Sequence, residues 1–241
     1  MDYLEIYKKL DFLPDSIRVQ YTNFIKKHLK NSSNEPILEH LIARIKSDEP
    51  IEYILNIAEF YGFEFYVDKR VLIPRVETEK IVMIALDQIL KSNDNYTVID
   101  IGTGSGCIIL SIAKVLNDLK TYQIDKIRFI GIEKSPLAYE VAKINRKRLS
   151  LEPTVELINI DFEKFDFNNY ENLIILANLP YIPNSRNLQS SVINFEPKEA
   201  LFGGQKGDEI IVKLKQKLTG LNNVKLLVLE NDHGIVEKIE L

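Results

Sequence analysis

The chain has 241 residues, of which 45% are hydrophobic and 27% charged, enough for one domain with a proper core and a small appendage. Its formal net charge of −4 argues against exposed nucleic-acid backbone as the main partner, because phosphate binding relies on excess Lys and Arg. The longest apolar runs are too short to span a membrane. A single cysteine, Cys107, and the absence of a charged-then-apolar leader predict a reduced, cytoplasmic setting.

Residues 1–58 show the apolar spacing of amphipathic helices. Tyr21 and Ile25 share one face of a predicted helix, and Leu41 and Ile45 share a face of another. We therefore expect a small N-terminal helical domain at residues 1–58.

Residues 59–75 are predicted to form a hairpin that links two domains. The aromatic-rich run at 60–67 suits a strand, residues 68–70 suit a turn, and residues 71–73 suit a return strand. Pro74 then ends the pattern.

Residues 76–241 alternate between helical and strand-like periods. We expect helices at 77–91, 106–117, 136–149 and 207–219, and strands at 96–101, 127–133, 154–160, 173–177 and 224–230. This order predicts an α/β fold with a doubly wound, mostly parallel sheet. Ligands of such sheets bind at the carboxyl ends of the strands.

A glycine-rich turn follows the predicted strand at 96–101. It consists of Gly102, Thr103, Gly104, Ser105 and Gly106. The dinucleotide fingerprint has two residues between its second and third glycines, whereas this turn has one, and Asp100 precedes the first glycine by two places. This form favours S-adenosylmethionine over NAD as the cofactor.

The next two strand ends carry side chains that suit the same cofactor. Glu133 could accept hydrogen bonds from two ribose hydroxyls, and Asp161 and Phe162 could flank an adenine ring. The alternative is that Glu133 and Asp161 are solvated loop carboxylates or helix caps, and that Phe162 belongs to the core. Their order along one doubly wound pattern favours the cofactor site.

The sequence Asn178-Leu179-Pro180-Tyr181 directly follows the apolar run at 173–177. Asn178 and the Pro180 carbonyl could accept the two N–H bonds of a planar nitrogen while Tyr181 stacks on its face, and Asn178 would also border the cofactor. This pattern indicates methyl transfer to nitrogen. A Pro-Tyr turn after a strand is the structural alternative.

We expect no metal ion at this site. The three histidines, His28, His40 and His233, are scattered along the chain. Cys107 is expected to pack at the start of a helix and to take no part in chemistry.

With these motifs the sequence closely resembles the HemK/PrmC family of protein-(glutamine-N5) methyltransferases. The resemblance rests on the segments 71–79, 100–106 and 196–204 and on the order of helical domain, hairpin and methyltransferase domain. It implies a class I S-adenosylmethionine-dependent methyltransferase that modifies the glutamine in the Gly-Gly-Gln motif of peptide chain release factors. By the same resemblance, the glycines, Glu133 and Phe162 would contact the cofactor, and the 178–181 corner would hold the glutamine amide. We interpret the helical domain at 1–58 as the part that binds this protein substrate.

Two other functions remain open at this point. Leu179 stands where the family usually has a proline, and Asn-Leu-Pro-Tyr also occurs in rRNA adenine-N6 dimethyltransferases, so an rRNA or DNA adenine-N6 methyltransferase is the first alternative. A non-catalytic cofactor-binding module is the second. The acidic net charge and the segments 71–79 and 196–204 favour the glutamine enzyme, with nucleic acid not a direct substrate.

Residues 235–241 resemble the first turns of a helix. The resemblance implies that this helix is followed by a final antiparallel pair of strands, so we expect the methyltransferase domain at 76–241 to lack the family's last strands. The strand at 224–230 would then form an exposed edge. We therefore expect either a shortened chain or a compensating contact there.

Overall fold

The chain divides into two compact units in its computed structural model, which describes residues 2–28, 35–92, 94–119, 124–231 and 236–240. The first unit comprises residues 1–57 and 188–195, and the second comprises residues 58–187 and 196–241. Within the described ranges, no helix combines the length and apolar character that a membrane crossing requires.

The first unit is helical, as its apolar spacing predicts. Its helices are α1 (Tyr3–Lys9), α2 (Asp15–His28), α3 (Glu35–Lys46), α4 (Ile51–Leu55) and α8 (Ser190–Phe195). Ile25, Leu41 and Ile45 lie in one buried cluster, and Tyr21 packs against it. The sequence did not predict that the distant segment 188–195 belongs to this unit.

The hairpin is shorter than predicted and turns earlier. Strand β1 (Ala58–Phe60) pairs antiparallel with β2 (Phe63–Phe65), and the turn is Tyr61-Gly62. Both turn residues have positive φ, 50° and 77°, which is the two-residue turn that matches the twist of a hairpin. A turn does occur at residues 68–70, where the Val71 N–H donates to the Asp68 carbonyl at 3.1 Å, but the described residues 71–73 that follow it form no strand. The predicted return strand at 71–73 is therefore wrong.

The second unit is built on a six-stranded sheet in the order β10-β9-β6-β3-β4-β5. Its parallel strands are β3 (Tyr96–Ile101), β4 (Ile127–Glu133), β5 (Val155–Asn159), β6 (Leu173–Ala177) and β9 (Val224–Glu230). Two short strands, β7 (Ile182–Pro183) and β8 (Phe202–Gly204), pair parallel outside this sheet. The doubly wound, mostly parallel α/β fold is confirmed.

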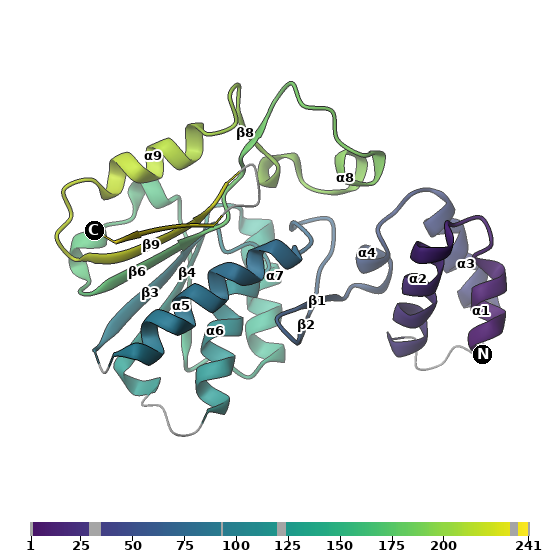
Figure 1. Cartoon of the computed structure of the whole chain (residues 1–241), viewed down its shortest axis with the longest axis horizontal. Coiled ribbons are helices and arrows are strands. Elements are labelled where there is room, and N and C mark those ends of the chain that lie inside the picture. The colour runs from purple at the N-terminus through teal and green to yellow at the C-terminus, as the bar shows by residue number, and fades with distance from the viewer. Residues whose placement is uncertain (1, 29–34, 93, 120–123, 232–235, 241) are drawn as a thin grey trace. The chain divides into compact units, whose positions relative to one another are not determined.

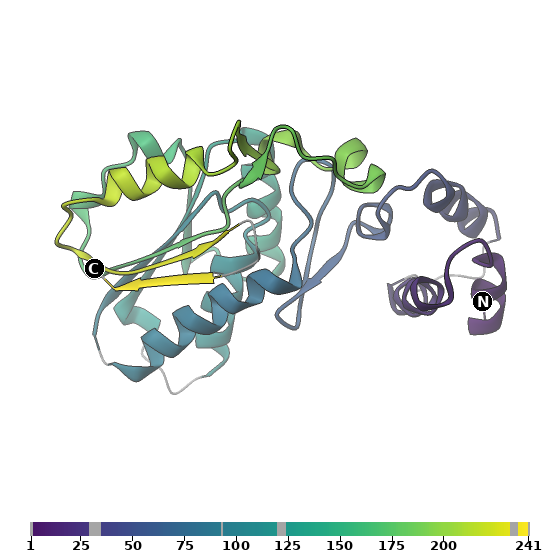
Figure 2. The ribbon, with the colours of Figure 1, turned by 45° about the horizontal axis from the view of Figure 1, so that its top comes forward.

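Helices cover both faces of this sheet (Figures 1 and 2). On one face lie α5 (Glu79–Lys91), α6 (Cys107–Asp118) and α7 (Pro136–Arg148); on the other lie α9 (Glu209–Leu218) and the 3-10 turns Phe162–Lys164 and Phe167–Asn169. Further 3-10 turns are Val76–Thr78, Ile124–Lys126 and Lys198–Ala200. Neighbouring strand residues such as Val98 and Ile99 belong to the two opposite hydrophobic clusters, as alternation along a strand requires.

The end of the described chain differs from the prediction. Val236–Glu240 forms strand β10, which pairs antiparallel with β9 from Val236 opposite Glu230. The predicted helix is therefore wrong for these residues, and residues 235 and 241 lie outside the described part. Pairing with the edge of β9 satisfies backbone groups that an edge strand would expose, and this outweighs the local helical spacing.

A buried asparagine joins three segments of the second unit. The Asn145 side chain on α7 donates to the carbonyl oxygens of Tyr66 and Ser105, at 2.9 and 2.8 Å, and accepts the Tyr66 N–H at 2.6 Å. Asn145 has no exposed surface. It therefore fixes the end of the glycine-rich turn and the segment after β2 to α7.

We expect Asn145→Leu, which keeps the size of the side chain but removes its polar atoms, to lower the free energy of unfolding by about 2–4 kcal/mol, because buried backbone groups lose their partners. Chemical denaturation measures this. The exposed Lys147→Ala on the same helix is the control, with an expected change within about 0.5 kcal/mol. Equal stabilities of the two variants would contradict the role of Asn145.

Candidate active site

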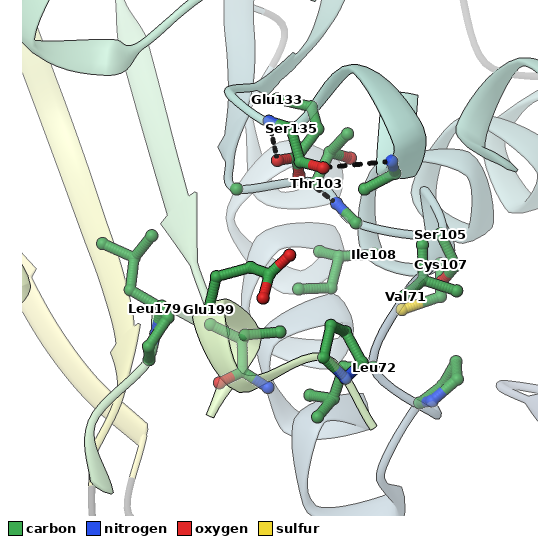
Figure 3. Close-up of a pocket in the computed structure, with 18 of the residues that line it drawn as sticks. Val71, Leu72, Thr103, Ser105, Cys107, Ile108, Glu133, Ser135, Leu179 and Glu199 are labelled. Atoms are coloured by element: carbon green, nitrogen blue, oxygen red, sulfur yellow. Dashed lines mark hydrogen bonds between the residues drawn. The ribbon is translucent and has the colours of Figure 1, made fainter. Parts of the chain in front are cut away.

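A cleft opens at the carboxyl ends of the parallel strands (Figure 3). Its walls come from the segment after the hairpin, the glycine-rich turn, the start of α7, the corner after β6 and the loop before β8. The predicted site residues that line it are Gly102, Thr103, Gly104, Ser105, Glu133, Asn178 and Pro180. The fold thus brings together the two motifs that the sequence singled out.

The two motifs touch directly. A Cβ atom at Gly102, where φ is 69°, would lie 3.0 Å from the Leu179 Cδ2 atom, so glycine is what allows Leu179 to close over the turn. Leu179 is 5% exposed and belongs to the hydrophobic cluster on the α9 side of the sheet. The leucine that replaces the usual proline therefore packs the corner against the glycine-rich turn.

Glu133, the last residue of β4, is hydrogen-bonded to the glycine-rich turn. Its carboxylate accepts the Gly104 N–H and the Ser135 N–H, both at 2.8 Å (Figure 3). Glu133 is 8% exposed, and this burial raises the pKa of its carboxyl group, with the nearby charge of Glu199 adding to the effect. Each oxygen keeps a further lone pair, so the carboxylate can still accept two hydroxyl donors.

Asp100 lies fully buried beneath the same turn. Its Oδ2 atom accepts the Thr103 hydroxyl at 2.6 Å, while Oδ1 has no hydrogen-bond partner in the part of the chain that the structure describes. Burial raises the pKa of this carboxyl group to about 7. Asp100 therefore titrates within the range of ordinary assay conditions.

An ion pair between the half-buried Arg75 and the buried Glu196 connects the walls formed by residues 70–78 and 196–200. The Arg75 guanidinium donates to Glu196, whose side chain is 1% exposed, and the Ile73 N–H donates to the same carboxylate at 3.2 Å. Glu199, three residues on, lines the cleft, and its side chain is directed into it (Figure 3). The ion pair thus fixes the loop that carries Glu199.

The corner after β6 is held by groups that the sequence analysis missed. The Asn178 Nδ2 atom donates to the Thr78 hydroxyl at 2.9 Å, and the Tyr181 hydroxyl donates to Glu230 at 2.9 Å. Glu230 ends a buried strand just as Glu133 does, and this shared pattern could have identified it. Thr78 and Asn178 are 100 residues apart in the chain, so no local sequence pattern indicates their contact.

Pro180 also depends on a close backbone contact. A Cβ atom at Gly203 would lie 2.3 Å from the Pro180 carbonyl oxygen and 2.0 Å from the Gly207 carbonyl oxygen. Only glycine therefore lets β8 pass behind the 178–181 corner.

Other predicted residues do not line this cleft. Asp161 accepts the Glu163 N–H and pairs with Lys134 at 2.8 Å, and Phe162 is 9% exposed in the cluster on the α9 side. Gly106 starts α6, and Tyr181 lies beside Glu230. Their roles toward a cofactor or substrate stay predictions.

No group of three or more His, Cys, Asp or Glu side chains arranged to hold a metal occurs within the described ranges. His233, one of the three scattered histidines, lies outside them. Cys107 is buried, and burial raises the pKa of its thiol to about 12, which keeps it protonated near neutral pH.

Comparisons with known proteins show the family of this chain. Residues 92–218 match the family model described as a methyltransferase domain. The release factor glutamine methyltransferase of Rhodopirellula baltica is 34% identical over 223 residues, which cover 87% of this chain and 70% of that protein. The chain belongs to the release factor glutamine methyltransferase family. Enzymatic methyl transfer and S-adenosylmethionine as the cofactor, both predicted from the sequence, are thereby confirmed.

Two further comparisons mark the extent of the likeness. The bifunctional methyltransferase of Rickettsia prowazekii is 31% identical over 78% of this chain, which spans only 40% of that protein. The hMettl16 catalytic domain, solved with an RNA hairpin, is 16% identical, with a TM-score of 0.53 over 73% of this chain and 64% of that one. At this identity the solved structure shows the fold alone.

The raised pKa of Asp100 predicts how stability depends on pH. Between the unfolded value near 4 and the folded value of about 7, the folded protein holds a proton that the unfolded chain has released, so stability falls as pH rises through this window. We expect Asp100→Asn to reduce the loss of Tm between pH 5 and pH 8 by at least roughly 2 °C, measured by thermal melting. The exposed Asp208→Asn should leave that loss unchanged; an Asp100→Asn protein with the wild-type dependence would contradict this account.

Proposed function

We propose that this chain transfers a methyl group from S-adenosylmethionine to the side-chain amide nitrogen, N5, of the glutamine in the Gly-Gly-Gln motif of peptide chain release factors. The observation that carries the proposal is the direct contact between the glycine-rich turn and the 178–181 corner within one cleft. Relatives named release factor glutamine methyltransferase support the same substrate. Such a substrate implies a cytoplasmic setting.

The chain's own groups suit the cofactor. Backbone from Gly102 to Ser105 lines the cleft without large side chains, and Glu133 presents a carboxylate to a ribose diol. In this proposal Gly106, Asp161 and Phe162 complete the surroundings of the adenosine. Bound S-adenosylmethionine supplies an electrophilic methyl group.

The acceptor nitrogen needs help from the protein, because its lone pair is delocalised into the neighbouring carbonyl. Asn178 Oδ1 and the Pro180 carbonyl oxygen accept hydrogen bonds from its two N–H groups, and Tyr181 stacks on the amide plane. These acceptors strengthen as the nitrogen becomes positive. The nitrogen gains the methyl group as the sulfonium C–S bond breaks to leave a neutral thioether, and it then releases one proton to solvent water. Holding two reactants at the right distance and orientation lowers the activation barrier by roughly 7–11 kcal/mol in well-oriented intramolecular reactions.

We expect Asn178→Ala to lower kcat for methylation of a release factor by more than about tenfold, because one acceptor of the reacting amide is lost. The Kd for S-adenosylmethionine should stay within about threefold, since the glycine-rich turn is intact. Transfer of labelled methyl and calorimetric titration measure the two quantities. Asn117→Ala, an exposed change on α6, is the control; a wild-type kcat for Asn178→Ala would remove this residue from the mechanism.

The proposal extends to how the release factor is held. We assign this role to the helical unit at 1–57 and to the loop at 182–204, because the loop runs from the reacting corner through α8, which belongs to the helical unit, and back to β8. Hydrogen–deuterium exchange with and without a release factor tests it. Slower exchange is expected in both segments, and an effect confined to other parts of the chain would contradict the assignment.

A further inference from the structure

A buried carboxylate stands beside the reacting corner without a role in the mechanism described above. Glu230 is the last residue of β9 and is 1% exposed. Ala177 of β6 pairs with Leu229 of β9, so Asn178 and Glu230 leave the sheet at the same level. A buried charge is costly unless it is fully hydrogen-bonded, so the partners of Glu230 are informative.

Both oxygens of Glu230 accept hydrogen bonds from hydroxyl groups. Oε2 accepts the Thr78 hydroxyl at 2.7 Å, and Oε1 accepts the Tyr181 hydroxyl at 2.9 Å. Thr78, itself 2% exposed, in turn accepts the Asn178 Nδ2–H at 2.9 Å. One carboxylate therefore connects to two residues of the reacting corner, to Tyr181 directly and to Asn178 through Thr78.

The direction of these hydrogen bonds follows from the protons available. An ionised carboxylate has no proton to donate, so the single hydroxyl proton of Thr78 is committed to Glu230. Thr78 can then only accept from Asn178, so the NH₂ group of the amide faces Thr78 and the oxygen faces away from it. A reversed amide would place two acceptors against each other.

We propose that Glu230 and Thr78 are positioning residues that set the direction of the Asn178 amide. The inference rests on the proposed function, in which Asn178 Oδ1 accepts an N–H of the substrate amide. With the opposite orientation Asn178 would present N–H donors to a substrate NH₂ group, and the two would repel. The same carboxylate also accepts the Tyr181 hydroxyl and thereby fixes the position of the aromatic ring.

Three variants test whether Thr78 and Glu230 act by setting the direction of the Asn178 amide or only by packing. Thr78→Val keeps the shape of the side chain but removes the hydroxyl, and Thr78→Ser keeps the hydroxyl. Glu230→Gln offers one oxygen to two hydroxyl donors, so one contact is lost or reversed. We expect Thr78→Val and Glu230→Gln to lower kcat for release-factor methylation by about 10- to 100-fold, with the Kd for S-adenosylmethionine within about threefold.

The conservative variant Thr78→Ser and the double variant Thr78→Val/Glu230→Gln distinguish a positioning role from a purely structural one. Thr78→Ser should restore kcat to within about threefold of the wild type. Because the two residues act as a unit, adding Thr78→Val to Glu230→Gln should lower kcat by less than about threefold more. A wild-type kcat for Thr78→Val, a loss in Thr78→Ser equal to that in Thr78→Val, or fully multiplicative losses in the double variant would each overturn the proposal.

A spectroscopic measurement keeps this proposal distinct from the proposed function. The Asn178 side-chain amide is observed by ¹H–¹⁵N NMR of the full chain and assigned with Asn178→Asp. Its hydrogen-bonded proton should exchange at least about tenfold faster with water in Thr78→Val and near the wild-type rate in Thr78→Ser. If the wild type methylated no release factor, the proposed function would fail, but the NMR signal would still test the orientation of the Asn178 amide. The same exchange rate in Thr78→Val and in the wild type would overturn the proposed orientation.

Discussion

Four parallel strands that end at one level position the candidate active site of this protein. Ile101 of β3 pairs with Ile132 of β4 and with Ala177 of β6, and Ala177 pairs with Leu229 of β9. The residues that follow leave the sheet together, so the glycine-rich turn, Glu133, the 178–181 corner and Glu230 converge although they are far apart in sequence. A shift of one residue in the register of β6 would turn its side chains to the opposite face and separate these groups.

The convergence concentrates buried carboxylates around one cleft. Asp100, Glu133, Glu196 and Glu230 are each less than 9% exposed. Their partners are backbone N–H groups, hydroxyls or a guanidinium, and each partner belongs to a segment that forms the cleft. These contacts fix the walls of the cleft, but they offset only part of the cost of burying the carboxylates, since burial still raises the pKa values of Asp100 and Glu133.

Much of the fold and part of the site follow from sequence because their signals are local. Apolar runs identified β3, β4, β6 and β9, and glycine spacing identified a turn that lines the cleft. Residues 68–70 do form a turn, but the hairpin closes earlier, at Tyr61-Gly62, where the backbone twist matches the two strands. Strand β10 was taken for a helix because pairing along β9, a tertiary effect, decides its conformation. Thr78 and Asn145 were missed for the same reason, since their partners lie 100 and 79 residues away.

We propose that the cleft beside Asn178 methylates a glutamine amide in a protein. The most direct test offers S-adenosylmethionine with a labelled methyl group to the intact chain, together with a purified release factor, a release factor whose Gly-Gly-Gln glutamine is changed to alanine, and unmodified rRNA. Fragmentation mass spectrometry then locates the label. The account predicts one methyl group on the side-chain nitrogen of that glutamine and none on the altered factor or the RNA. Label on rRNA adenine, with none on the release factor, would contradict it.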